Sequence, residues 1–469
     1  MSSKELTGIE SSRLEHAHMM LNHEVRSLKR TLDVCVRLDE WRPWQLSKGL
    51  TKLRAKVASA FMGYPSRSLK IVGVTGTDGK TTTTELIAGL LSASGRRVSC
   101  INSIGASIAG QRLESRWLLT TPGPFVIQAL FHWMKQRGSE WVVIEASSHG
   151  LAQWRLDGVA FHIGVMTNLT PEHLDYHRDM DSYAAAKAVL LRNVIQRGSG
   201  KGTVILNRDD PSHAGFAALA GGLQVSYGLS PAADVRASSI DLDEESSTFE
   251  VATPRDQFRV VLALPGLFNV YNALAAVAVG YSQGVDPTSM AEGLRSVTQL
   301  RGRMSPISEG QPYSVMIDHA HTPHALEQVL RFFREKVKGR IIVVFGCPGE
   351  RWPGKRLLMG EIAGLLADRV VLTGEDDRSE SVYAIMHAIA EGLQRAGRQE
   401  GVDYVLLPDR REAIQRACDM AEAGDLVLIA GKGHEPTINV NGRDLPWQEE
   451  AVARDAIRRR MGLSSVSLR

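Results

Sequence analysis

A glycine-rich turn, G-T-D-G-K-T, stands between a strand-like run and a helical pattern. Gly76 and Gly79 allow such a turn to aim backbone N–H groups and the next helix N-terminus at an anion. Lys80 can then reach terminal phosphates, and the hydroxyl of Thr81 can bind Mg²⁺. The usual phosphate-loop pattern G-x-x-x-x-G-K-S/T requires glycine where Val74 stands, so this loop is a shortened form. The turn predicts a bound nucleotide and by itself leaves kinase, switch protein, motor and ligase open.

Three further side chains could complete a catalytic set. Glu145 ends the strand-like run WVVIE, and His173 follows another strand-like run in TNLTPEHLDYH. Because the carboxyl ends of parallel strands share one edge of a sheet, both should lie near the nucleotide, where Glu145 is a natural Mg²⁺ ligand. Lys187 lies on the helix that follows. Singly, Glu145 could be a helix cap, His173 a satisfied polar residue and Lys187 a solvated charge.

The elements that must position these residues alternate between strand-like and helical patterns, which is typical of an α/β fold. The first series contains KIVGV, WVVIEAS, HIGVMTNL and GTVILN, followed by a β-richer stretch and a long apolar helix. A second series after QLRGRM contains YSVMIDHA, GRIIVVFG, DRVVLTGE, VDYVLLPD and GDLVLIAGKG. We therefore predict a central P-loop ATPase-type domain with a parallel sheet, residues 67–299, and a C-terminal Rossmann-like α/β domain, residues 300–469.

Residues 1–66 are predicted to form a short helical N-terminal module. Apolar residues recur there every three or four positions, as expected for an amphipathic helix, at Leu21, Val25, Leu28, Leu32 and Cys35. Trp41 and Trp44 are expected to pack this helix on the next domain, with an aromatic ligand shelf as the alternative. A dimer contact through the helix and packing within one chain both fit the pattern.

Composition narrows the class of protein. A chain of 469 residues with 43% apolar content can fill two or three cores. Without an 18-residue apolar run, and with a polar N-terminus, neither a membrane span nor a signal peptide is expected, which favours the cytoplasm. The four scattered cysteines fit a reducing compartment, and a dispersed net charge of +3 indicates no nucleic-acid surface.

Nine segments, in this order, resemble the Mur ligases, and within that family most of all the MurE group. They are VTGTDGKTTTT, TTP, EASSHGLAQWRLDGVAF, TNLTPEHLDYHRDMDSYAAAK, LPGLFNVYNALAA, RGRM, IDHAHTPHALE, VFGCPGERWPGKRLLMG and AGKGHE. The resemblance implies an ATP-dependent amide-forming ligase that adds the third residue of the peptidoglycan stem peptide. In such enzymes the γ-phosphate of ATP passes to a carboxylate, and an amine then attacks the acyl phosphate.

The resemblance also implies roles for the nucleotide and metal residues. Lys80 would hold the phosphates, Thr81 and Glu145 one Mg²⁺ ion and His173 a second, while Lys187 matches a carbamylated lysine. The ATP site would consist of Gly76, Thr77, Asp78, Gly79, Lys80, Thr81, Thr82, Asn269, Asn272, Arg303 and Asp318. His319 and His324 replace the tyrosine and aspartate of the family's DYAHTPDAL segment.

Substrate residues follow from the same resemblance. A muramyl-dipeptide-like donor would be held by Thr120, Thr121, Ser147 and Arg155. The amino-acid acceptor would be held by Arg351, Asp376, Arg378, Gly431 and Glu435. The acceptor motif DNPR of the diaminopimelate-adding enzymes reads EDDR here, and its added negative charge is expected to favour an ammonium. A diaminopimelate-like acceptor is the leading expectation.

Alternatives remain at this stage. The family's α/β N-terminal domain, which grips the uridine diphosphate tail, has no counterpart in the helical module, so a non-UDP, non-peptidoglycan donor is one alternative. A folylpolyglutamate synthase-like ligase shares fold and mechanism, although GKGHE and EASSHG favour MurE. A non-catalytic nucleotide-binding subunit is a third, which the complete set of Lys80, Thr81, Glu145, His173 and Lys187 disfavours.

Overall fold

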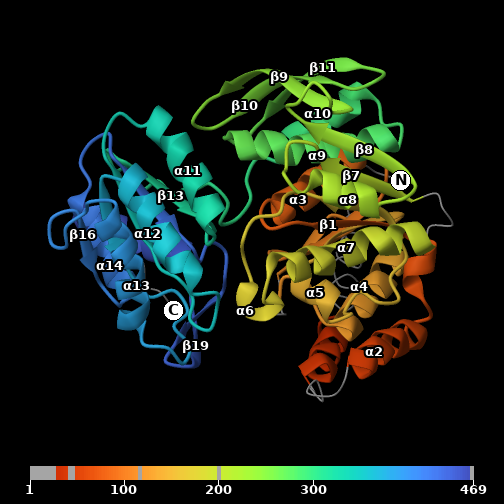
Figure 1. The fold of residues 1–469 in the computed structure, drawn as a ribbon, viewed down its shortest axis with the longest axis horizontal. Coiled ribbons are helices and arrows are strands. Elements are labelled where there is room, and N and C mark those ends of the chain that lie inside the picture. The colour runs from red at the N-terminus through yellow and green to blue at the C-terminus, as the bar shows by residue number, and fades with distance from the viewer. Residues whose placement is uncertain (1–27, 41–47, 115–118, 198–201, 465–469) are drawn as a thin grey trace, which may run out of the picture.

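Two α/β lobes, each built on its own sheet, make up the folded chain (Figure 1). The computed structural model describes residues 28–40, 48–114, 119–197 and 202–464. The predicted helix start at Leu21 and Val25 and the tryptophans Trp41 and Trp44 lie outside these ranges. Within them, every helix is too short or too polar to cross a membrane.

The central lobe is organised by a mixed sheet with a parallel middle. Its strands are β1 Lys70–Thr75, β2 Val98–Asn102, β3 Gly105–Ile108, β4 Gln111–Glu114, β5 Trp141–Glu145, β6 Phe161–Met166, β7 Thr203–Asn207, β8 Leu223–Gly228, β9 Val235–Leu242, β10 Ser247–Ala252 and β11 Gln257–Leu262. Within the described residues their order is β11-β10-β9-β8-β7-β6-β1-β5-β2-β3-β4. In this order, neighbouring strands from β9 through β8, β7, β6, β1 and β5 to β2 pair in parallel. The strands β3 and β4 at one edge and β10 and β11 at the other are added by antiparallel pairs.

Both faces of the parallel middle of this sheet are buried under helices. Side chains alternate along a strand, so Val72 and Val143 contact one layer while Ile71 and Val142 contact the other. The first layer consists of α3 Lys80–Ala93, α9 Leu267–Ser282 and α10 Pro287–Arg295. The second contains α4 Pro124–Gln136, α5 Ser148–Ala152, α7 Met180–Arg197 and α8 His213–Leu219. Burial on two sides explains why the parallel strands are continuous apolar runs.

The C-terminal lobe is a second α/β layer structure. Its strands are β12 Ser305–Pro306, β13 Ser314–Asp318, β14 Ile341–Phe345, β15 Arg369–Leu372, β16 Tyr404–Leu406 and β17 Leu426–Ala430, in the order β12-β13-β17-β14-β15-β16. All pair in parallel except β12. One face is covered by α11 Pro323–Lys336, α12 Gly354–Leu366 and α13 Val382–Arg395, and the other by α14 Arg410–Met420 and α15 Glu449–Arg460.

Two smaller pieces flank the lobes. A hairpin of β18 Thr437–Val440 and β19 Arg443–Pro446 follows β17. A short helix, α6 Leu174–His177, lies on the side of the central lobe that faces the C-terminal lobe (Figure 1). We propose domain limits near residues 66 and 299, since β1 begins soon after the first and β12 soon after the second.

The described part of the N-terminal module packs on its own chain. Residues 28–40 are helical, and α2 Lys48–Phe61 and the 3₁₀ helix η1 Pro65–Ser68 follow. Leu28, Leu32 and Cys35 are buried in the same apolar cluster as α4. Asp39 accepts hydrogen bonds from the N–H groups of Phe125 and Val126 at 3.3 and 3.0 Å, which caps the start of α4. The apolar face of residues 28–40 is therefore used within the chain.

Asp39 gives this contact a pH dependence. Its side chain is 10% exposed, and burial raises its pKa to about 6 despite the two backbone hydrogen bonds. The folded carboxyl therefore holds its proton more tightly than the unfolded one, so its contribution to stability is greatest below about pH 4 and is lost as the pH rises to about 6. Asp39→Asn keeps an oxygen that can accept the two hydrogen bonds but does not titrate, so the variant should not lose this stability as the pH rises. Thermal unfolding midpoints at about pH 5 and pH 7 should change less in the variant than in the wild type; equal changes would contradict the assignment.

Candidate active site

The glycine-rich turn joins β1 to α3 and needs glycine at two points. Gly76 and Gly79 have φ angles of 150° and 80°. A Cβ at Gly76 would collide with the hydroxyl of Thr167, and one at Gly79 would collide with the side-chain oxygen of Asn272. Gly79 is also the N-cap of α3, so no side chain stands between the helix N-terminus and the cavity in front of it. Such a terminus favours an anion.

A cavity of about 500 Å³ opens in front of this loop. Its central-lobe wall contains residues 77–82 and the start of α9, including Asn269 and Asn272, which are joined by a 3.1 Å hydrogen bond. Its C-terminal wall contains Asp318 from the end of β13 and the start of α11. This volume fits a nucleotide-sized ligand with its phosphates on the loop.

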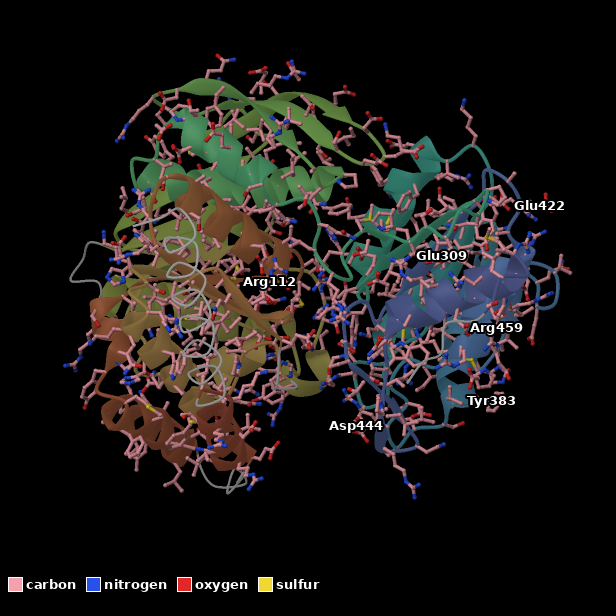
Figure 2. All side chains as sticks on the ribbon, turned by 180° about the vertical axis from the view of Figure 1, so that it is seen from behind. Arg112, Glu309, Tyr383, Glu422, Asp444 and Arg459 are labelled. Carbon is pink, nitrogen blue, oxygen red and sulfur yellow. The ribbon has the colours of Figure 1, made fainter. Side chains whose placement is uncertain are left out.

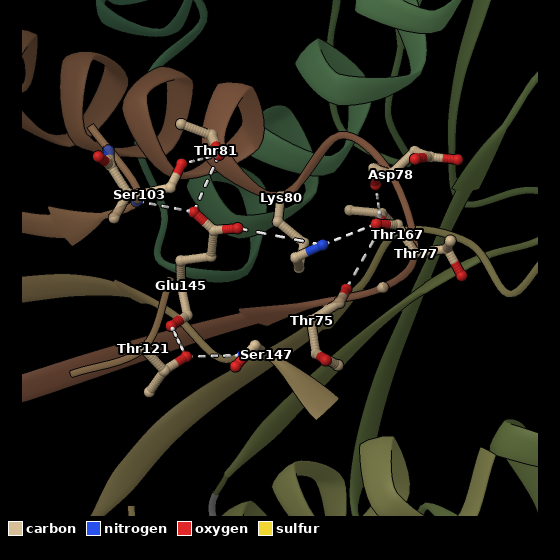
Figure 3. Close-up of polar contacts among 12 residues, drawn as sticks. Thr75, Thr77, Asp78, Lys80, Thr81, Ser103, Thr121, Glu145, Ser147 and Thr167 are labelled. Carbon is tan, nitrogen blue, oxygen red and sulfur yellow. Dashed lines mark hydrogen bonds and ion pairs between the residues drawn. The ribbon is translucent and has the colours of Figure 1, made fainter. Parts of the chain in front are cut away.

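Glu145 lies at the centre of the hydrogen-bond network beneath the loop (Figure 3). Its Oε2 accepts from the Thr81 hydroxyl at 2.9 Å and from the Ser103 N–H at 3.1 Å. The Lys80 ammonium lies 4.0 Å from Oε1. Thr121 donates to the Glu145 carbonyl and accepts from the Ser147 N–H, which fixes the end of β5. Hydroxyl and carboxylate oxygens are thus directed at one point beside the phosphate loop.

Lys187 is buried behind the same loop. Its side chain is 1% exposed, and Nζ donates to the Gly76 carbonyl at 2.5 Å. Nζ also lies 4.2 Å from the centre of the Tyr183 ring. Burial, followed by the nearby Lys80, holds the pKa of Lys187 well below its usual range. The environment therefore favours the neutral amine.

His173 belongs to a cluster of aromatic rings next to Lys187. Its ring lies 4.6 Å from that of His149, and its backbone is left-handed at φ 59°. Its buried Nδ1 has no hydrogen-bond partner within the described residues. Burial, followed by His149, holds the pKa of His173 well below its usual range. His173 therefore presents a neutral, unsatisfied nitrogen.

A second cavity of about 420 Å³ adjoins the first. On the central-lobe side it is lined by Gly76, Thr120, Ser147, Arg155, His173 and Lys187. On the C-terminal side it is lined by Arg351, Glu375, Asp376, Arg378 and Glu435. Both cavities are also lined by Lys80, Glu145 and Arg303, so they meet at the phosphate loop.

Several contacts among the described residues join the C-terminal lobe to the central lobe, and two of them lie at the loop. Arg303 donates to the Thr81 hydroxyl at 3.3 Å. Thr322, the N-cap of α11, donates to the Asp78 carboxylate at 3.1 Å. These two hydrogen bonds connect the C-terminal lobe to Thr81 and Asp78 of the phosphate loop.

A buried ion pair also joins the two lobes. Lys355 and Glu172 lie 3.1 Å apart, and their side chains are 1% and 2% exposed. Lys355 also donates to the His321 carbonyl at 3.0 Å. Since Glu172 precedes His173, this pair joins the C-terminal lobe to the histidine cluster.

The Asp376 carboxylate has a cationic partner inside the protein. Both of its carboxylate oxygens lie 3.0 Å from the Lys432 ammonium, and one accepts from the Asn439 N–H at 2.7 Å. Lys432 also contacts Glu435. The expectation that the negative charge of Asp376 favours an ammonium stays a prediction, and the structure adds that a buried lysine, shared with Glu435, pairs with that carboxylate.

Comparison with known proteins identifies the family. The Mur ligase middle domain matches residues 74–280, and the Mur ligase glutamate ligase domain matches residues 302–433. The chain is 40% identical over 413 residues to a UDP-N-acetylmuramyl-tripeptide synthetase from Roseiflexus sp. (strain RS-1), covering 86% of this chain and 81% of the relative. This chain belongs to the Mur ligase family. Like the rest of the MurE group within it, the ligase is an ATP-dependent, amide-forming enzyme of peptidoglycan synthesis.

Other relatives agree with this Mur ligase assignment. A UDP-N-acetylmuramoyl-L-alanyl-D-glutamate--2,6-diaminopimelate ligase from Geobacillus thermodenitrificans is 38% identical, covering 87% of this chain and 82% of its own length. A solved ligase of the same name is 32% identical with a TM-score of 0.58, covering 87% and 83% of the two chains. A folylpolyglutamate synthase from Mycobacterium tuberculosis shares the fold at a TM-score of 0.71 and 17% identity, covering 86% and 96%.

The ligase structure brings most of the predicted site residues to the two cavities. Those lining the first cavity are Thr77, Asp78, Gly79, Lys80, Thr81, Thr82, Glu145, Asn269, Asn272, Arg303, Asp318, His319 and His324. Neither cavity is lined by Thr121, which supports Glu145 and Ser147 from behind, or by Gly431, which lies against Glu375.

Sequence reasoning missed several residues of the site. Lys355 and Lys432 stand inside the quoted motifs GERWPGKR and AGKGHE, but nothing local marks a lysine as buried. Thr322 had a usable signal, since threonine before proline is typical of a helix start. Ser103 follows the short strand β2, and no motif of the sequence marks it.

Proposed function

We propose that this Mur ligase joins a muramyl-dipeptide-type carboxylate to the amine of an amino acid through an acyl phosphate. The observation that carries the proposal is the meeting of the two cavities at Lys80, Glu145 and Arg303. A phosphoryl group held there has the nucleotide on one side and the second cavity on the other. Transfer of this kind depends on positioning and charge neutralisation, which these cations supply.

ATP would occupy the larger cavity. Its phosphates would lie on the N-terminus of α3, with Lys80 and Arg303 beside the terminal one. Asn269 and Asn272 would face the adenine, and Asp318 at the end of β13 would face the ribose. The Asp78–Thr322 hydrogen bond would then keep the C-terminal lobe closed over the nucleotide.

The residues present fit Mg²⁺. Thr81 and Glu145 offer oxygen ligands 2.9 Å apart, and the unpartnered Nδ1 of His173 fits a second ion. Among the described residues no three histidine, cysteine, aspartate or glutamate side chains form a site of their own, so ATP oxygens and water would complete the coordination. Bound Mg²⁺ would neutralise phosphate charge.

Lys187 would act as a carbamate. Its neutral amine can add CO₂ and lose a proton, which converts a would-be cation into an anion beside the phosphate loop. The hydrogen bond from Nζ to Gly76 and the Tyr183 ring position the group. The negative charge would help to hold the metal and would leave Lys80 free for the phosphates.

Donor and acceptor would enter the second cavity from opposite walls. Thr120, Ser147 and Arg155 would hold the donor peptide, while Arg351 and Arg378 would bind acceptor carboxylate groups. The names of the similar enzymes point to diaminopimelate as acceptor and to a UDP-linked donor. The attacking amine would approach the acyl carbon from the C-terminal side, and phosphate would leave toward Lys80.

Phosphate release tests the proposal. The assay combines the full-length protein, ATP and Mg²⁺ with muramyl dipeptide, with or without its UDP carrier, and with single amino acids. We expect release that requires both a donor and an amino acid, with diaminopimelate among the best acceptors. Comparison of phosphate release with the two donors shows whether a ligase with this helical N-terminal module needs the UDP carrier on its donor. Failure of every donor and acceptor pair to stimulate release would refute the proposed function.

A further inference from the structure

Helix α2 turns a stripe of apolar side chains away from the protein. This apolar stripe consists of large residues that recur every three or four positions and are 46–77% exposed: Leu50, Leu53, Val57 and Phe61. The opposite face of α2 packs on the central lobe through Ala55 and Ser59, which lie against Gly158. Surface helices normally direct their apolar face toward the core, so α2 has the reverse arrangement. A contiguous exposed apolar surface of this kind marks an interaction site.

Basic side chains lie on both sides of the apolar stripe. Since each residue turns a helix by about 100°, Lys52 and Lys56 lie on one side of the stripe and Arg54 on the other. Lys56 is exposed, and the Lys52 ammonium lies 4.6 Å from the centre of the Trp154 ring. Arg54 pairs with Asp39 at 3.4 Å. The two lysines therefore remain available to an anionic partner beside the stripe.

The segment around α2 carries charge of one sign. Residues 41–77 contain seven arginine and lysine residues and no aspartate or glutamate, whereas the whole chain has a net charge of only +3. Beyond the end of α2 the chain adds Tyr64, whose ring centre lies 4.1 Å from the guanidinium carbon of Arg67. Aromatic side chains with a polar tip favour the boundary between lipid and water.

α2 lies apart from the reaction site. Figure 1 and Figure 2 show the molecule from opposite sides, and in both views α2 lies at an outer edge of the central lobe, away from the C-terminal lobe. No described residue of α2 lines either of the two cavities. A partner that covers the apolar stripe would therefore leave both cavities free.

We propose that α2 binds this ligase to an anionic lipid surface, with the apolar stripe in the interface and the lysines beside the lipid headgroups. A helix that lies in a membrane surface needs one apolar face and basic flanks, and it gains from aromatic residues at the boundary; α2 and Tyr64 meet these conditions. Anionic headgroups supply the negative charge that residues 41–77 lack. A second copy of this chain fits less well, because the charged residues of α2 are all basic and two such helices would repel each other.

Vesicle binding tests this proposal. Full-length protein is sedimented with phosphatidylcholine vesicles that contain or lack about 30% phosphatidylglycerol. We expect a partition coefficient at least about tenfold higher for the anionic vesicles, and weaker binding at about 0.5 M NaCl, because salt screens the lysines. Leu53→Gln/Phe61→Gln removes apolar surface, and Lys52→Gln/Lys56→Gln removes charge. Each double variant should lower the partition coefficient about tenfold.

Leu365→Gln/Val402→Gln is the matched control, since it changes two exposed apolar residues of the C-terminal lobe and should bind vesicles as the wild type does. A wild type that stays in solution with anionic vesicles would overturn the proposal. Vesicle binding that is unchanged in Leu53→Gln/Phe61→Gln would do the same, because charge alone would then explain it. So would a dimer, seen by sedimentation equilibrium without vesicles, that this variant dissociates, since the stripe would then belong to a second copy.

Discussion

Lys187→Ala is expected to reduce turnover about 10³-fold while ATP binding remains close to that of the wild type. Lys187 lines the second cavity and not the nucleotide cavity, so its loss leaves the walls around the nucleotide intact. In the proposed mechanism the substitution removes the carbamate charge beside the transferred phosphoryl group, and such groups typically contribute two to three orders of magnitude in rate. Phosphate release gives the turnover, and titration with a fluorescent ATP analogue gives the nucleotide Kd.

The carbamate has a signature of its own. Wild-type protein in ¹³C-labelled bicarbonate should show a carbamate carbonyl signal by ¹³C NMR, and Lys187→Ala should lack it. Arg192→Ala, an exposed position on the same helix α7, is the matched control and should change neither turnover nor the spectrum. Unimpaired turnover in Lys187→Ala would refute the carbamate role.

Lys355→Met should lower the free energy of unfolding by about 3–5 kcal/mol, because it leaves Glu172 buried without a partner. The two side chains are 1% and 2% exposed and lie on different lobes, so the same change should also weaken closure of the C-terminal lobe. Urea unfolding followed by tryptophan fluorescence measures the first effect. An increase in the radius of gyration by small-angle X-ray scattering measures the second.

Two comparison proteins isolate the buried charge as the cause. The double variant Glu172→Gln/Lys355→Met removes both charges and should recover most of the stability. Arg331→Met breaks an exposed pair with Glu327 on α11 and should cost at most about 0.5 kcal/mol. If Lys355→Met were no worse than Arg331→Met, the buried pair would not be what holds the lobes together.

The sequence alone determined the fold class and the place of the glycine-rich turn between strand and helix. Apolar runs such as KIVGV and WVVIE are buried on both faces of a parallel sheet. Because burial on both faces makes a strand continuously apolar, such strands can be predicted from the sequence. The glycine turn fixes its own conformation, since Gly76 and Gly79 take φ angles that other residues avoid. Ordered motifs then placed Glu145, His173 and Lys187 around it.

Only the tertiary structure decided the charges of the substrate cavity. The spacing of the EDDR segment cannot show that Lys432, more than fifty residues later, pairs with Asp376 while Glu375 stays unpaired. Nor can the sequence show that Lys355 and Glu172 meet across the lobes. Local patterns report backbone preference and burial of whole faces, whereas the pairing of a buried charge depends on which distant side chain the fold brings within a few ångströms of it.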